Sequence, residues 1–241
     1  MSARLAFLII RGKIYININS KSGDIMKKTL YSLMLNDEVM REVDMLAHSM
    51  GTNRSNLVNE ILAEYVNYVT PERRINDVLN SIEELMKPSR ELRPVIAPNS
   101  FSVSLKSSLE YKYRPTIKYE VLLYKTQEDG LGEISVNFRT TSDQLIGAMT
   151  GFFRLWKSIE DAHLLPLLHG EKIRYSLSDG KFTRSIAVPL NDCSASELGS
   201  ALSEYIRLFD TLLKSYLSGR LSAHEIEAAY YSWLVNTEIR F

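Results

Sequence analysis

Cysteine is almost absent from this sequence of 241 residues, which contains Cys193 alone. A single cysteine excludes an internal disulfide and a zinc site made of several thiolates, and it is typical of a protein in a reducing cytoplasm. An excess of charge of either sign is missing as well, because 29 Lys and Arg residues balance 29 Asp and Glu residues. Binding to nucleic acid or to a membrane surface therefore has to be argued from local patterns and not from net charge.

Long apolar runs and the motifs of common enzyme classes are also missing. The longest apolar run near the start, 5–10, has six residues, against about 20 for a membrane-spanning helix. The sequence has no phosphate-binding glycine loop, nucleophile elbow or cysteine pattern for zinc, and His163 and His169 offer too few ligands for a metal site. We therefore expect a cytoplasmic protein that has no membrane partner, no catalytic activity, no metal and no cofactor.

The first 25 residues differ from the rest, because they are apolar and basic and lead to a second methionine, Met26. The codons of Gly23 and Asp24 can spell a ribosome-binding sequence just before it. We therefore expect translation to start at Met26, with 1–25 as a leader or a disordered arm. The alternative is an additional N-terminal strand at 13–18. The mass of the intact protein from its native source tests the start site.

Residues 26–70 carry the most regular pattern of the chain. Apolar side chains alternate along 30–35, which predicts a short strand. Asn36 then caps a helix whose apolar positions are spaced by three and four residues and which ends at Gly51. Asn53 caps a second helix. This segment is thus expected to contain one strand followed by two helices.

The predicted strand needs a second chain. A strand of about five residues is not stable alone, and no partner strand follows within about 60 residues. Two copies that pair antiparallel about a twofold axis form a ribbon narrow enough to enter the DNA major groove. One face of that ribbon would cover the helices. The expected dimer core consists of Tyr31, Leu33, Leu35, Val39, Val43, Leu57 and Ile61.

Three features together resemble the ribbon-helix-helix family of DNA-binding proteins, the CopG, MetJ and Arc type. They are the alternating strand with its four-residue step from Leu35 to Val39, the twelve-residue step from Val39 to Gly51, and the turn at 51–55. The resemblance covers 27–69, roughly one sixth of the chain. It implies a homodimer that binds double-stranded DNA and acts as a sequence-specific transcriptional regulator.

The resemblance also implies which residues contact DNA. The outward strand positions would contact base edges: Leu30, Ser32 and Met34. The arm before the strand and the amino end of the second helix would contact phosphates: Lys27, Lys28, Asn53, Arg54 and Ser55. Leu30 and Met34 depart from the polar residues usual in the family, so contact with thymine methyl groups and contact with a protein both stay open.

The charge of this segment limits the affinity that we expect. Residues 26–70 carry four basic and six acidic side chains. We therefore expect modest affinity for each dimer, strong salt dependence, and several dimers on adjacent sites.

The remainder of the chain follows a different pattern. Residues 71–98 are expected to form a connector helix and a proline-containing linker. Alternating apolar segments and capping boxes in 99–241 predict an α+β domain of about five strands and three helices. The strands are expected at 101–105, 117–124, 134–138, 173–177 and 182–188, and the helices begin near Ser142, Ser194 and Ser222.

Single side chains in this domain give no sign of a site. Phe152, Phe153 and Trp156 are interpreted as core, and Glu160 and Asp161 as solvated charges. The domain is expected to sense an unknown ligand, to engage a protein or to add oligomer contacts. Two alternatives to a regulator stay open: an antitoxin-like protein-interaction module, and a DNA-binding protein of plasmid or chromosome segregation.

Overall fold

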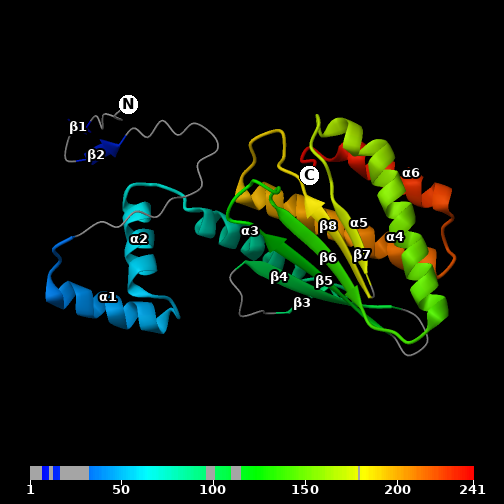
Figure 1. The fold of residues 1–241 in the computed structure, drawn as a ribbon, viewed down its shortest axis with the longest axis horizontal. Coiled ribbons are helices and arrows are strands. Elements are labelled where there is room, and N and C mark those ends of the chain that lie inside the picture. Colours follow the sequence, from blue (N-terminus) through cyan, green and yellow to red (C-terminus); the bar gives the residue numbers. More distant parts are fainter. Residues whose placement is uncertain (1–6, 11–12, 17–32, 96–100, 110–114, 179) are drawn as a thin grey trace. The chain divides into compact units, whose positions relative to one another are not determined.

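The computed structural model describes residues 7–10, 13–16, 33–95, 101–109, 115–178 and 180–241. The chain divides into two compact units, Met1–Pro71 and Glu72–Phe241 (Figure 1). Within the described ranges, no helix combines the length and apolar character that crossing a membrane requires.

The described residues of the first unit form two short strands and two helices. Strands β1 (Phe7–Ile10) and β2 (Lys13–Ile16) pair antiparallel. Strand β2 lies within 13–18, where a strand is the alternative to a leader, and the start of translation at Met26 stays a prediction. Helices α1 (Asp37–Ser49) and α2 (Arg54–Tyr65) follow.

The ends of α1 and α2 confirm the helix boundaries that the sequence predicts. The side-chain oxygen of Asn36 accepts a hydrogen bond from the backbone N–H of Glu38 at 2.8 Å, and that of Asn53 accepts one from Asn56 at 2.9 Å. Gly51 has φ +65°, the left-handed conformation that a glycine after a helix supplies without strain. Asn36 thus fixes the start of α1, Gly51 follows its end, and Asn53 fixes the start of α2.

The second unit is built on an antiparallel sheet of six strands in the order β3-β4-β5-β6-β8-β7. Five of the strands, from β4 onward, lie where the sequence predicts strands in 99–241. The strands are β3 (Arg93–Val95), β4 (Ser102–Ser108), β5 (Thr116–Leu123), β6 (Gly132–Phe138), β7 (Tyr175–Ser178) and β8 (Lys181–Ile186).

Four α-helices contribute to the core of this unit, and α5 runs behind the strands in Figure 1. Ser142, Ser194 and Ser222 cap the last three of these helices, as predicted, and the caps at Ser194 and Ser222 are complete capping boxes. The helices are α3 (Pro71–Met86), α4 (Asp143–His163), α5 (Ala195–Leu217) and α6 (Ala223–Asn236), with a 3-10 turn at Leu165–Leu167. The α+β fold class is therefore confirmed for the second unit.

Helix α3 corrects the interpretation of 71–98 as a connector and linker. Val78, Ile82 and Met86 are buried in the core of the second unit, and β3 pairs with β4. Gly199 of α5 lies so close to α3 that a Cβ atom there would stand 2.7 Å from the Cβ of Ser81. The apolar stripe that suggests a connector helix in the sequence is thus part of the domain core.

Candidate functional site

The predicted DNA-contacting strand lies mainly outside the described residues. This holds for the base positions Leu30 and Ser32, for Tyr31, and for the arm residues Lys27 and Lys28. The neighbouring residues Leu33, Met34 and Leu35 are described, have no helix or strand assignment, and are exposed. The ribbon therefore stays a prediction.

The predicted dimer core is largely open to solvent in the single chain. Leu57 is buried at 3% exposure and Val43 is half-buried, whereas Val39 and Ile61 are exposed. Thirteen of the twenty large apolar side chains that the structure exposes fall in 33–69. Apolar surface of this extent on a helical pair is typical of a surface that another segment or chain covers.

The amino end of α2 is free to meet an anion. Asn53, Arg54 and Ser55 are all exposed. The first N–H groups of a helix have no partner within the helix, and the helix dipole places partial positive charge there. The Asn53 cap occupies the N–H of Asn56, so the cap and a phosphate contact are compatible at this helix end.

Arg54 forms a contact that the sequence pattern does not indicate. Its guanidinium donates from Nε and Nη2 to the two carboxylate oxygens of Asp44 on α1. The hydrogen bond from Arg54 lowers the pKa of Asp44, and the same bond raises the pKa of Arg54. Both side chains are exposed, at 56% and 42%. A phosphate that binds Arg54 therefore has to compete with Asp44 at the protein surface.

A second polar cluster lies fully inside the second unit, around Glu160 of α4. Arg184 of β8 donates from Nε to both oxygens of Glu160, at 3.0 Å each. Three tyrosine hydroxyls also donate to this carboxylate, at 2.8, 3.0 and 3.4 Å: Tyr175, Tyr205 and Tyr230. The side chains of Glu160 and Arg184 are 0% and 1% exposed.

The electrostatics of this cluster favour a fixed charge distribution. Burial raises the pKa of Tyr205 well above its usual value, and burial followed by the charge of Glu160 raises those of Tyr175 and Tyr230. Burial alone would lower the pKa of Arg184, but Glu160 and the tyrosines raise it overall. The three tyrosines thus stay neutral and Arg184 stays charged at neutral pH, which favours a structural role for these side chains.

The cluster corrects the interpretation of Glu160 as a solvated charge. Asp161, the next residue, does lie near the surface, where it pairs with Lys157. Trp156 and its neighbours are buried, as predicted, and the Trp156 Nε1 donates to the Tyr205 hydroxyl at 2.8 Å. Glu160 follows the buried Trp156 by four residues, so the helical spacing of apolar residues in α4 could have indicated that Glu160 faces inward.

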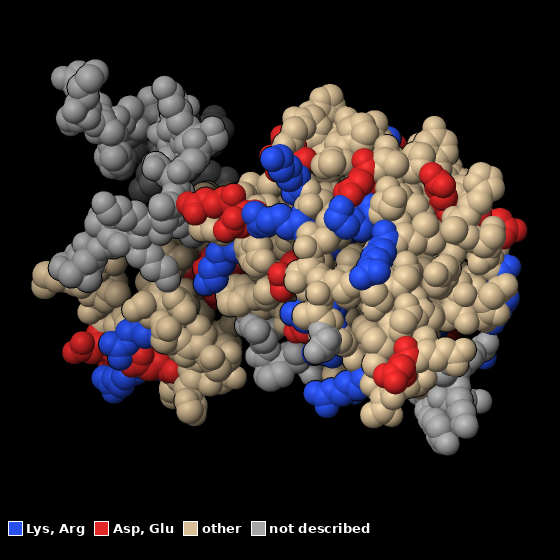
Figure 2. Space-filling model, turned by 45° about the vertical axis from the view of Figure 1, so that its right-hand side comes forward, with Lys and Arg blue, Asp and Glu red and all other residues tan. Residues whose placement is uncertain are grey.

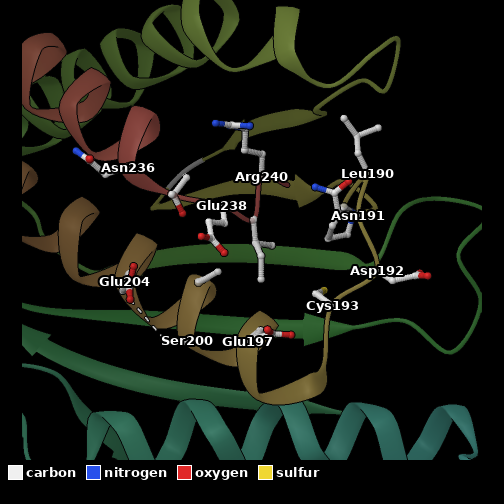
Figure 3. Close-up of a pocket in the computed structure, with 14 residues that line it drawn as sticks. Leu190, Asn191, Asp192, Cys193, Glu197, Ser200, Glu204, Asn236, Glu238 and Arg240 are labelled. Carbon is white, nitrogen blue, oxygen red and sulfur yellow. Dashed lines mark hydrogen bonds between the residues drawn. The ribbon is translucent and has the colours of Figure 1, made fainter.

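One cavity of about 300 Å³ opens between the loop after β8, the first turns of α5 and the tail after α6 (Figure 3). Its charged lining is mostly acidic. The acidic residues are Asp192, Glu197, Glu204 and Glu238, and Arg240 is the basic one. Glu197 is committed to capping, because it accepts from the backbone N–H and the hydroxyl of Ser194, which lowers its pKa.

Cys193 lies at the edge of this cavity and is partly buried. Burial is the main cause that raises the pKa of its thiol. A raised pKa leaves the thiol protonated and unreactive at neutral pH. In the part of the chain that the structure describes, no three side chains of the His, Cys, Asp and Glu types gather as metal ligands.

The visible surface of the second unit carries charges of both signs among uncharged side chains (Figure 2). This mixture agrees with the balanced charge of the whole sequence. Comparison with known proteins adds no assignment, because no protein-family model, no curated protein and no solved structure matches the chain.

Proposed function

We propose that this protein is a homodimeric, sequence-specific regulator that binds double-stranded DNA through a ribbon-helix-helix unit at 26–70. The observation that carries the proposal is the pair of capped helices, α1 and α2, whose apolar side chains stay exposed in the single chain. In a ribbon-helix-helix dimer, such side chains become the core between two copies.

The geometry of α2 supports the assignment of the phosphate contact. Its amino end is exposed, carries Arg54 and Ser55, and begins at the capping residue Asn53. The turn before it is fixed by Gly51 and by the bond from the Thr52 N–H to the Ala47 carbonyl at 2.9 Å. A rigid turn presents the free N–H groups of α2 in one direction, which suits a helix that grips one phosphate of each half-site.

Met34 favours a second candidate function. It is fully exposed at a position proposed to face the bases, and an exposed apolar side chain also suits contact with a protein, as in an antitoxin. We assign the second unit the role of a ligand sensor or oligomer module, with the cavity beside Cys193 as the place for a small ligand. A segregation protein would share the same DNA-binding unit.

Genomic DNA capture by the purified full chain, followed by sequencing at two salt concentrations, tests the proposal. Enrichment of a short repeated site near promoters is the expected result. Repeats clustered at a replication origin would indicate segregation. No enrichment at either salt concentration would contradict DNA binding and favour the protein-interaction module.

Two substitutions test the assignment of individual residues. Ser32→Ala should change the sequence preference, because Ser32 is proposed to contact base edges. Arg54→Ala should weaken binding to all sequences about equally and reduce the salt dependence, because a phosphate contact carries no sequence information. Equal loss of affinity with unchanged preference in both variants would contradict the proposed register.

A further inference from the structure

The face of the second unit's sheet that points away from the helices carries a row of basic residues. Antiparallel register places Arg93 opposite Lys106, Lys106 opposite Lys118, Lys118 opposite Asn137, and Asn137 opposite Lys181. Directly opposed residues point to the same face of a sheet. Their apolar neighbours on the same strands, such as Leu105 and Tyr119, point into the core. We define the basic row as four basic residues and one asparagine: Arg93, Lys106, Lys118, Asn137 and Lys181.

The charges of the basic row are poorly compensated. Arg93, Lys106 and Lys181 are exposed, and among the described residues none of them forms an ion pair. Lys118 contacts Glu120 at 3.4 Å. The open face also carries Glu133, but the row itself contains no acid. Like charges directly opposite each other destabilise a sheet, so the fold tolerates an electrostatic cost along this line.

We propose that the basic row is a second DNA-binding surface, which contacts the phosphate backbone of a duplex without reading its sequence. This inference rests on the proposed function, since it adds a contact to the same ligand. Four strand intervals of about 4.8 Å place the ends of the row about 19 Å apart. Duplex DNA presents one negative charge for each ~1.7 Å along its axis, so a row of this length faces several phosphates at once.

The rest of the open face favours a duplex over a single strand. The neighbouring strand positions carry small hydroxyl side chains. Ser104 and Ser135 lie opposite Glu120, and Thr183 lies opposite Ser135. No aromatic residue occupies an open-face position of the described strands. Proteins that bind single strands without sequence preference stack the bases on aromatic side chains, and the described strands present none on this face. The open face instead offers positive charges that complement the rigid phosphate backbone of a duplex.

The test measures binding of the full chain to a mixed-sequence duplex between about 50 and 200 mM salt. The row variant is Lys106→Gln with Lys181→Gln. The matched control is Arg154→Gln with Lys172→Gln, which removes the same charge from exposed positions of the same unit outside the row. Each lysine that contacts a phosphate should lower the slope of log K against log salt by about 0.9. We expect at least about a tenfold loss of affinity at low salt for the row variant, and wild-type affinity for the control.

Thermal unfolding separates lost binding from lost structure. Since Lys106 lies between two like charges, the row variant should melt no lower than the wild type. Equal affinity of the row variant and the control would overturn the inference, and so would row-dependent binding that appears with single-stranded DNA but not with the duplex. Loss of affinity in Arg54→Ala, with wild-type affinity in the row variant, would support the ribbon and contradict the row. Row-dependent binding with no effect of Arg54→Ala would instead support the row and contradict the ribbon.

Discussion

The carboxylate of Glu160 and the guanidinium of Arg184 form an ion pair that is almost completely shielded from solvent, although one belongs to α4 and the other to β8. Arg184 also donates to the backbone carbonyl of Phe241, whose ring packs against Tyr205. The pair therefore ties the sheet, two helices and the segment after α6 to one another.

Removal of either partner of this pair should destabilise the second unit strongly. Arg184→Met leaves a buried carboxylate without its cation, which typically costs about 3–5 kcal/mol of unfolding free energy. Glu160→Gln leaves a buried guanidinium and should cost a similar amount. The double variant should lose less than the sum of the two, and urea unfolding of all four proteins measures this coupling.

Asp161→Asn is the control for this cycle, because it removes a carboxylate from the adjacent position of α4. Asp161 pairs with Lys157 at the surface, and such pairs contribute at most about 1 kcal/mol. A destabilisation by Asp161→Asn as large as that by Glu160→Gln would show that burial of the Glu160 pair is not what stabilises the unit.

The buried tyrosines predict how the protein responds to alkali. Burial raises the pKa of Tyr119 and Tyr205 well above the usual 10.0. A native pKa above the unfolded one means that this contribution to stability is complete below about pH 10 and is lost as the pH rises toward the native pKa. These phenols should therefore ionise together with unfolding, as followed by tyrosinate absorbance and circular dichroism. Tyr119→Phe should reduce the coincident absorbance change, whereas complete ionisation at unchanged circular dichroism would contradict the prediction.

Gly199→Ala tests whether α3 belongs to the core of the second unit. The added Cβ would lie 2.7 Å from the Ser81 side chain and 3.1 Å from the Val78 carbonyl oxygen, and overpacking of this kind costs about 1–3 kcal/mol. Gly147→Ala on α4 is the control, since its Cβ would meet nothing within 4 Å. It should stabilise the protein by about 0.5–1 kcal/mol because alanine favours a helix. Equal midpoints of urea unfolding for the two variants would contradict close packing of α3 on α5.

Asp44→Asn should strengthen DNA binding. The substitution removes the carboxylate that holds Arg54, so Arg54 becomes available to a phosphate and one acidic charge leaves the unit. We expect a several-fold gain in affinity and a steeper salt dependence, measured by fluorescence anisotropy with a duplex. Glu64→Gln on α2 is the charge-matched control. A gain of the same size in both variants would indicate a general effect of charge and not the release of Arg54.

Ile61→Lys should separate the proposed dimer without unfolding the single chain. Ile61 is exposed in the single chain, so a lysine there meets water, but in a dimer core its charge would be desolvated. Sedimentation velocity should show a shift from dimer to monomer. The control Val235→Lys changes a similarly exposed apolar residue of α6 and should leave the dimer intact. A dimer that survives Ile61→Lys would place the interface elsewhere.

Local signals in the sequence predict most of the second unit's elements and both helices of the first. Ser194 with Glu197, Ser222 with Glu225, and the Asn53 cap each satisfy free N–H groups within three residues, so a short stretch of sequence is enough to place the helix start. Alternation along β5 likewise identifies its buried face, because one face of an antiparallel sheet meets the core and the other meets water.

Contacts between distant residues are what the sequence leaves undetermined. Arg184 and Glu160 are 24 residues apart, and neither has a neighbour in the chain that indicates the pairing. Arg54 and Asp44 meet only because Gly51 turns α2 back onto α1. The basic row is assembled from residues 93–181, and no local pattern links its members until the register of the sheet is known.

The order of the strands in the sheet determines which part of the second unit can fold first during synthesis. Strands β4, β5 and β6 pair with their neighbours in sequence, so a nascent chain can form this meander early through local contacts. Its apolar face is covered by α5, which is synthesised about 60 residues after β6. A chain that stalls between them exposes Ile117, Val121 and Ile134 on a preformed sheet, which makes the truncated product a target for chaperones and prone to aggregation.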